Sequence, residues 1–107
     1  MSTPAASNSP ESHSKTACFS VRTEADPSAL SRLIEFFALL NIVPDSFRSR
    51  RFADGSMVVS LKVRGLSDER VDVIANKLRS VVVVHSVATE IFAVGGDLED
   101  YRLAQSA

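Results

Sequence analysis

The chain has 107 residues, of which 45% are hydrophobic, and this is enough apolar material for one core but too little for two. Its 12 Lys and Arg residues nearly balance its 13 Asp and Glu residues. Such a balance lacks the positive field that proteins binding a phosphate backbone usually carry. The composition therefore predicts one domain and argues against nucleic acid as a partner.

The cysteine count and the N-terminal segment bear on the compartment. A single cysteine, Cys18, excludes an internal disulfide and a multi-cysteine metal site within one chain. Residues 1–15 lack the apolar segment and basic start of a signal peptide, and no stretch approaches the roughly 18 apolar residues that span a bilayer. We therefore expect a cytoplasmic protein that is neither exported nor embedded in a membrane.

Both ends of the chain are predicted to be tails outside the folded domain. Residues 2–14 carry no large apolar side chain that could offset the entropy of ordering. Near the other end, Gly95 and Gly96 close the last apolar run, and the acidic stretch after them could form at most a short helical turn. The predicted organisation is a disordered N-terminal tail at 1–15, one domain at 16–94 and a flexible C-terminal tail at 95–107.

The domain opens with a predicted strand and a predicted helix. Ala17, Phe19 and Val21 recur at every second position, which is typical of a strand with one buried face. Asp26 and Pro27 then mark a helix start, since aspartate caps the first turn and proline suits the first helical position. The expected apolar stripe of this helix, which Asn41 should close before Pro44, is Leu30, Leu33, Ile34, Phe37 and Leu40.

A predicted hairpin follows. The arginine-rich segment from about Asp45 to Ala53 has the charged character of an edge strand, and the pair Asp54-Gly55 favours a tight turn. The return strand is predicted to be central, because one of its faces is wholly apolar: Met57, Val59, Leu61 and Val63.

A second helix and a last strand complete the domain. Ser67 is the expected N-cap, and the apolar stripe after it consists of Val71, Ile74, Ala75 and Leu78. The run from Val81 to Val84 is β-branched throughout, which predicts the start of a strand that continues to about Phe92.

This order of elements predicts an α+β domain of the ferredoxin-like βαββαβ kind. Two split βαβ halves with right-handed crossovers give a four-stranded antiparallel sheet with two helices on one face. The helix stripes and the apolar strand faces would form the core between the two layers. Because this architecture serves metal carriers, phosphatases, RNA-binding modules and regulatory domains, its function has to be argued from its sites.

The residues give no sign of a catalytic or metal site. The loop from Thr23 to Ser28 has no soft metal ligand, and His13 and His85 are far apart in sequence. Cys18 lacks a neighbouring base on its strand face, which favours an inert thiol. Helix caps and solvated helix faces account for the carboxylates. We therefore predict no catalytic residue, no metal and no cofactor.

RNA binding is the functional alternative that the residues raise. RNA-recognition sheets stack bases on aromatic side chains of their central strands, whereas the third strand presents Val58, Ser60 and Lys62 on that face. A solvated or partner-facing charged sheet is therefore favoured over an RNA-binding module. The basic side chains that alternation places opposite the helices, beside Phe52, are Arg22, Arg48, Arg50, Lys62 and Arg64.

Two stretches resemble the ACT domain of acetolactate synthase small subunits. Residues 26–34, DPSALSRLI, and residues 41–47, NIVPDSF, are similar to the family pattern acid-Pro-Gly-Ala-Leu-Ser-Arg, an apolar helix, then Gly-aromatic-Asn-Ile-Glu-Ser-Leu. Residues 77–87, KLRSVVVVHSV, resemble the family ending Leu-x-Lys-Leu-Val-x-Val-x-x-Val. The resemblance covers about residues 17–90 of the chain.

This resemblance implies a non-catalytic regulatory protein of the short small-subunit type. Its partner would be a thiamine-dependent acetolactate synthase large subunit in branched-chain amino acid synthesis. A stand-alone, amino-acid-sensing ACT protein of unknown partner is the alternative. We also expect a homodimer, or a complex with the large subunit, that covers a sheet edge or the face opposite the helices.

The resemblance also implies a candidate ligand site. The family's glycine after the proline is Ser28 here, the glycine that ends the helix is Asn41, and the asparagine that would bind an amino-acid ligand is Val43. Because valine cannot pair a charged group, we expect small amino acids to bind weakly or not at all. The candidate residues are Asp26, Ser28, Ala29, Leu30, Asn41 and Val43.

Overall fold

The computed structural model describes residues 15–93, so the predicted tails, apart from Lys15, lie outside the described residues. Its elements are β1 (Lys15–Glu24), α3 (Pro27–Leu39), β2 (Ser46–Arg51), β3 (Ser56–Arg64), α4 (Asp68–Arg79) and β4 (Val84–Ala93).

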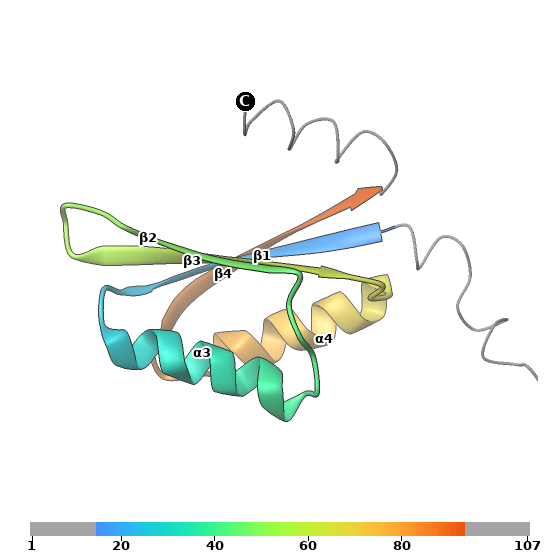
Figure 1. The fold of residues 1–107 in the computed structure, drawn as a ribbon, viewed down its shortest axis with the longest axis horizontal. Coiled ribbons are helices and arrows are strands. Elements are labelled where there is room, and N and C mark those ends of the chain that lie inside the picture. The colour runs from blue at the N-terminus through green and yellow to red at the C-terminus, as the bar shows by residue number, and fades with distance from the viewer. Residues whose placement is uncertain (1–14, 94–107) are drawn as a thin grey trace, which may run out of the picture.

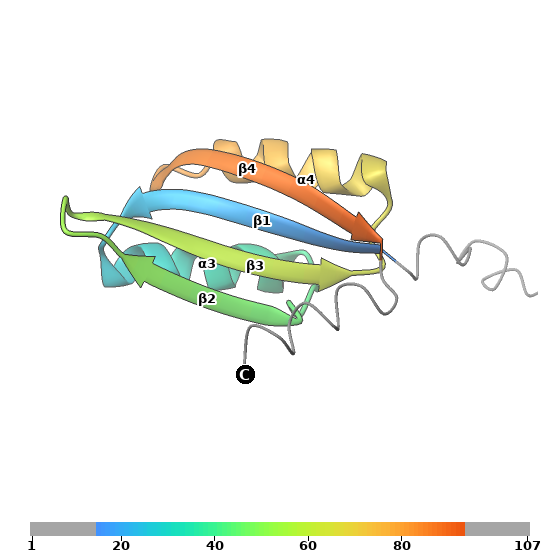
Figure 2. The ribbon, with the colours of Figure 1, turned by 90° about the horizontal axis from the view of Figure 1, so that it is seen from above.

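The four strands form one antiparallel sheet in the order β2-β3-β1-β4. Both helices lie on one side of this sheet (Figure 1). Seen from above, the strands cross in front of the two helices, and the opposite face is left uncovered by any helix of the described chain (Figure 2). The predicted ferredoxin-like βαββαβ architecture, with β3 central and β2 at an edge, is confirmed.

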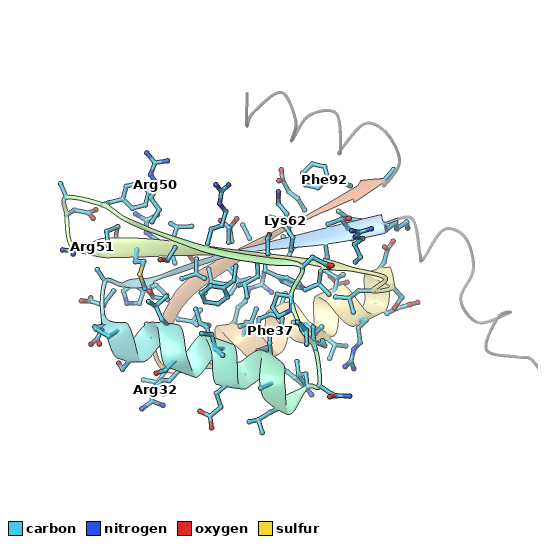
Figure 3. All side chains as sticks on the ribbon, in the orientation of Figure 1. Arg32, Phe37, Arg50, Arg51, Lys62 and Phe92 are labelled. Carbon is cyan, nitrogen blue, oxygen red and sulfur yellow. The ribbon has the colours of Figure 1, made fainter. Side chains whose placement is uncertain are left out.

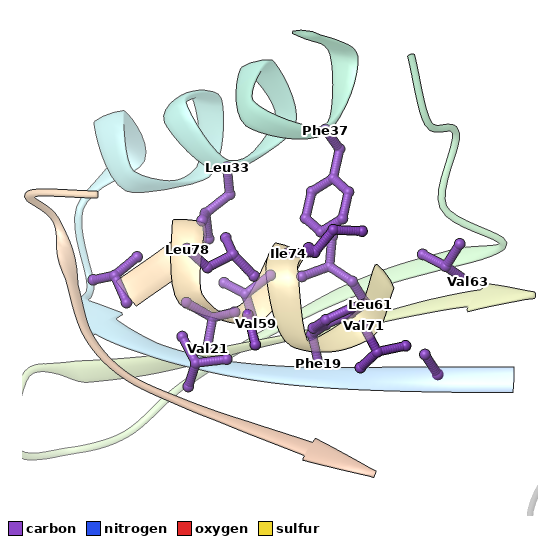
Figure 4. Packing of buried hydrophobic residues seen from close by; sticks show 14 of the residues in the cluster. Phe19, Val21, Leu33, Phe37, Val59, Leu61, Val63, Val71, Ile74 and Leu78 are labelled. Carbon is purple, nitrogen blue, oxygen red and sulfur yellow. The ribbon is translucent and has the colours of Figure 1, made fainter. Parts of the chain in front are cut away.

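The core lies between the sheet and the two helices. Phe19 and Leu61 project from the central strands and are fully buried, and Leu33 and Phe37 of α3 pack against this layer together with Ile74 of α4 (Figure 4). The Phe19 and Phe37 rings meet edge to face with centroids 5.9 Å apart, a favourable aromatic geometry. The predicted apolar strand faces and the α4 stripe therefore form this core as expected.

Both helix starts follow their capping residues. Asp26 is the N-cap of α3, and its carboxylate accepts a hydrogen bond of 2.9 Å from the Ser28 N–H. Ser67 caps α4, and its hydroxyl oxygen accepts a bond of 3.1 Å from the Arg70 N–H. Beyond the end of α3, Asn41 has a φ of +61°, the left-handed conformation expected of it.

Three expectations differ from the structure. Ile34 was expected in the core, but it is 55% exposed, because the stripe that faces the sheet runs through Ala29, Leu33 and Phe37 at four-residue spacing. Ile34 lies about 100° around the helix from Leu33, on the flank of this stripe that faces solvent. Lys15, assigned to the tail, is the first residue of β1 and pairs with Ala93.

The third difference concerns the last strand, which begins at Val84 and not at Val81. The Val84 N–H donates to the Val81 carbonyl oxygen over 2.9 Å, so this part of the valine run is a turn, and Val82 is 91% exposed. β-Branched residues favour strands, but the connection from α4 to the sheet needs a turn at this position.

Candidate functional site

The first four predicted ligand residues lie at the start of α3. The Asp26 carboxylate already accepts the capping hydrogen bond from the Ser28 N–H. This hydrogen bond is the main cause of the lowered pKa of Asp26. The Ala29 N–H donates to the Asp26 carbonyl oxygen over 2.9 Å. Ala29 is buried and Leu30 packs partly against the core. Asp26 thus accepts from two of the N–H groups that a ligand carboxylate would need here.

The other two predicted residues lie at the opposite end of the same helix. Asn41 follows the last turn, and Val43 is 89% exposed in the connection to β2. Since α3 has 13 residues and a helix rises about 1.5 Å per residue, the two groups are separated by about 20 Å. The structure therefore does not bring the six residues together within one chain.

An apolar hollow lies beside Val43. It has a volume of about 430 Å³ and is bounded by the C-terminal half of α3, the connection after it and the edge of the sheet. No charged side chain lines it among the described residues. Its lining residues are Ile34, Phe37, Ala38, Ile42, Val43, Pro44, Phe47 and Leu61.

Hydrogen bonds hold the connection that forms the rim of this apolar hollow. At one end, Asn41 turns the chain back, and the Ile42 N–H donates to the Phe37 carbonyl oxygen over 2.9 Å. At the other end, the Asp45 N–H donates to the Lys62 carbonyl oxygen over 2.7 Å, and the Asp45 carboxylate accepts from the Arg64 N–H over 2.8 Å. Val43 and Pro44 thus stand between two fixed points.

The lining of the apolar hollow decides what it can bind. It offers hydrocarbon surface, which attracts apolar side chains by the hydrophobic effect. A free amino acid would also bury an ammonium and a carboxylate group, and these cost free energy unless they are paired. The hollow is therefore better suited to apolar side chains of another protein than to a small zwitterion.

This hollow is not predicted by the amino-acid sequence, because the helical spacing of α3 places Ile34 in the expected core stripe. A signal was present: α3 carries more apolar residues than one buried stripe requires, and Leu39 is also exposed. Val43 and Phe47 complete the surface from separate segments, and only the fold shows that these segments meet.

The face of the sheet away from the helices carries basic side chains, as alternation predicted. The register sets Arg50 of β2 opposite Val58 of β3, and Val58 opposite Arg22 of β1, so these three share one face. Lys62 stands opposite Cys18 on the same face. Arg50 and Lys62 point away from the helices, whereas Arg32 of α3 lies on the helix side (Figure 3).

Two side chains that are reactive in other proteins, Cys18 and His85, lie within the described chain. Burial raises the pKa of the Cys18 thiol, against an opposing effect of Lys62, so little of the reactive thiolate forms at neutral pH. His85 is exposed, and its Nε2 lies 3.9 Å from Glu24 Oε2. Within residues 15–93 there is no group of three or more metal-binding side chains close enough to share an ion.

Neither α3 nor α4, the two helices of the described chain, combines the length and the hydropathy needed to cross a bilayer.

A family model described as ACT-like domain matches residues 10–94. The crystal structure of the ACT domain from GTP pyrophosphokinase of Chlorobium tepidum is 15% identical and has a TM-score of 0.59, covering 70% of this chain and 96% of that one. No curated protein matches the sequence.

Two further solved structures share the fold. The C-terminal domain of the MgtC protein from Mycobacterium tuberculosis is 10% identical, with a TM-score of 0.58 over 76% of this chain and 90% of that one. A formyltetrahydrofolate deformylase from Pseudomonas putida KT2440 is 14% identical, with a TM-score of 0.54 over 73% of this chain and 28% of that one. At these identities the likeness concerns the fold alone.

Proposed function

Because the chain belongs to the ACT-like domain family, we propose that it is a non-catalytic regulatory module that acts by binding a larger protein. One observation carries the proposal: the apolar hollow between α3 and the sheet edge is open to solvent. Ile34 and Val43, which line it, are 55% and 89% exposed. Removing apolar surface of this kind from water is favourable by about 25 cal/mol per Å², before the entropy and desolvation costs of association are subtracted.

As the partner we propose the thiamine-dependent large subunit of acetolactate synthase. The support is the resemblance of residues 26–34 and 41–47 to the small-subunit pattern. The second of these segments contains Val43 and Pro44, which form the rim of the apolar hollow. On this proposal the part of the chain that most resembles the small subunits also contributes to the contact surface.

Affinity capture with the full-length chain tests both proposals: that the chain is a regulatory module that binds a larger protein, and that this protein is the acetolactate synthase large subunit. The informative variant is Ile34→Asp, which puts a charge on the hollow. The matched control is Val73→Asp, which puts the same charge at a 44% exposed valine of α4. We expect wild type and Val73→Asp, but not Ile34→Asp, to recover the large subunit from the source cell, with all three folded by circular dichroism.

Other outcomes of the capture experiment distinguish a wrong partner from a wrong association surface. A different protein that is lost only with Ile34→Asp would support the regulatory module and contradict acetolactate synthase. If sedimentation shows a monomer at every concentration and no partner depends on Ile34, the apolar hollow is not an association surface.

The alternative is a stand-alone amino-acid sensor, which predicts tight binding of a small amino acid. We expect valine, leucine and isoleucine to bind in the millimolar range or more weakly, because Asp26 caps α3 and Val43 cannot pair a charged group. Calorimetric titration of the full chain measures this. A dissociation constant of about 10 μM or below for any of the three would favour the sensor.

A further inference from the structure

We propose that the open face of the sheet, meaning the face away from the helices, binds an extended acidic segment of a partner protein. This surface is separate from the apolar hollow, which is lined from the helix side by α3 and the segment after it. The inference therefore does not depend on what the hollow binds.

The open face carries an excess of positive charge. β1, β2 and β3 bring five basic side chains to the open face, and the acidic side chains on the same face are Glu24 of β1, opposite Ser56, and Glu90 of β4, opposite Cys18. The whole chain has a formal net charge of −1, so the positive charge of this face is local. The five side chains are Arg22, Arg48, Arg50, Lys62 and Arg64.

Most of this charge is not neutralised within residues 15–93. Arg64 is close to one carboxylate, with its Nε 3.9 Å from Asp45 Oδ1. Arg22 contacts the Ser56 hydroxyl at 3.5 Å and lies near the Asp54 carboxylate, whose pKa is lowered chiefly by hydrogen bonds from Ser56 and also by the charge of Arg22. Arg48, Arg50 and Lys62 have no ion pair within the described part of the chain. Like charges held on one face repel one another, and an anionic partner relieves that repulsion.

One side of this face is shaped as a shallow hollow of about 500 Å³, lined by Arg48, Ser49, Arg50, Phe52, Val58 and Ser60. The Arg50 guanidinium carbon lies 5.7 Å from the centroid of the Phe52 ring, within range of a cation–π contact. A guanidinium held on a ring loses less conformational freedom when it pairs with a carboxylate. This second hollow, on the open face, therefore combines an ordered cation with apolar surface.

The spacing of the cations fits a polypeptide in extended conformation. Arg48 and Arg50 are two residues apart on β2, so they recur at about 6.7 Å along the strand. Acidic side chains at alternate positions of an extended segment recur at the same interval. Such a segment could pair both arginines while its other side chains meet Val58 and Phe52.

Two other occupants fit less well. A second copy of the chain docked open face to open face would oppose five cations to five cations, with two carboxylates from each copy, Glu24 and Glu90, on the same faces. Single-stranded RNA would need aromatic platforms on the central strands, but β1 and β3 present Ser20 and Ser60 at the middle of this face. An acidic protein segment needs neither.

Fluorescence anisotropy with the full chain tests the inference. The probe is a labelled peptide of about eight residues that alternates glutamate and serine. We expect Arg48→Ser/Arg50→Ser to weaken its binding by about tenfold or more, since both lost contacts are charge-assisted. The matched control, Arg32→Ser/Arg70→Ser, removes the same charge from exposed helix positions and should change binding by less than about twofold. Binding should weaken as salt is added.

Several results would overturn the proposal. One is no detectable peptide binding, and another is an equal loss for the two double variants, which would mean a net-charge effect. Tighter binding of a short oligouridine than of the peptide at the same salt would indicate nucleic acid. A gain of about tenfold on neutralising the chain's own Asp97, Glu99 and Asp100 would instead make that segment the occupant.

Discussion

The two helices cover the same face of the sheet but differ in what they leave exposed. α4 has acidic residues in its first turn and basic residues in its last turn, and it buries the whole of its predicted apolar stripe. α3 has no acidic residue in its first turn beyond the N-cap Asp26 and no basic residue in its last turn, and Ile34 and Leu39 project from it into solvent. The fold therefore accounts for α4, whereas α3 carries apolar surface that the fold does not use.

The largest expected effect tests whether the buried sides of the two helices contribute alike. Phe37→Ala should lower the free energy of unfolding by about 3–5 kcal/mol, because the ring is 1% exposed and contacts two other rings. Ile74→Ala on α4 should cost about 2–5 kcal/mol. Urea denaturation measures both.

Leu39→Ala is the control for Phe37→Ala, since its exposed side chain on the same helix should matter by less than about 0.5 kcal/mol. A loss below about 1.5 kcal/mol for Phe37→Ala would mean that α3 is not held by its buried stripe.

A smaller effect concerns the C-terminal ends of the helices. The C-caps Leu40 of α3 and Ser80 of α4 both have ordinary φ values, −85° and −90°, and α3 is then followed by Asn41 with a φ of +61°. Asn41→Ala should therefore destabilise the protein by about 1 kcal/mol, and Asn41→Gly should be neutral or slightly stabilising. Ser80→Ala is the comparison on α4. Thermal unfolding of the three variants measures these changes in stability. An Asn41→Ala variant as stable as wild type would contradict the left-handed conformation of Asn41.

The smallest effect concerns the N-caps and depends on pH. The pKa of Asp26 is lowered in the folded chain, chiefly by the Ser28 N–H, so its stabilising contribution is present above the usual aspartate pKa of about 3.9. That contribution disappears as the pH falls through the lowered value. The Ser67 cap of α4 has no ionisable group and contributes no such step.

Asp26→Asn keeps a capping oxygen without the charge, so it isolates the pH term. The difference in urea midpoint between wild type and Asp26→Asn should be steady above about pH 5 and should change below about pH 4. A difference that does not vary with pH would show that the Asp26 carboxylate is not specifically stabilised in the folded state.

The features that the sequence predicted well are local ones. Strand alternation placed Phe19 on the buried face and Arg50 on the open face, and the pair Asp26-Pro27 located the start of α3. These patterns depend on neighbours in sequence and on the fixed periods of strands and helices. The same reasoning correctly expected a left-handed Asn41.

The features that it missed depend on how elements meet in space. Whether Ile34 or Ala29 faces the sheet depends on the rotation of α3 about its axis, and both choices are compatible with a helical stripe. Val81 belongs to a turn because α4 must reconnect to an edge strand. The apolar hollow escaped prediction for the same reason, since it combines α3, Val43 and Phe47 from three segments.

The anchoring of the connection between α3 and β2 has a kinetic consequence. Asn41 and Asp45 hold this segment at its two ends, so Val43 and Pro44 already stand at the rim of the apolar hollow before any partner arrives. Because the loop is already ordered, binding of a protein here does not require a preceding ordering step. The loss of loop entropy on binding is correspondingly smaller. Association should then proceed at the ordinary rates of preformed surfaces, about 10⁵–10⁷ M⁻¹s⁻¹, and the lifetime of the complex should set its affinity.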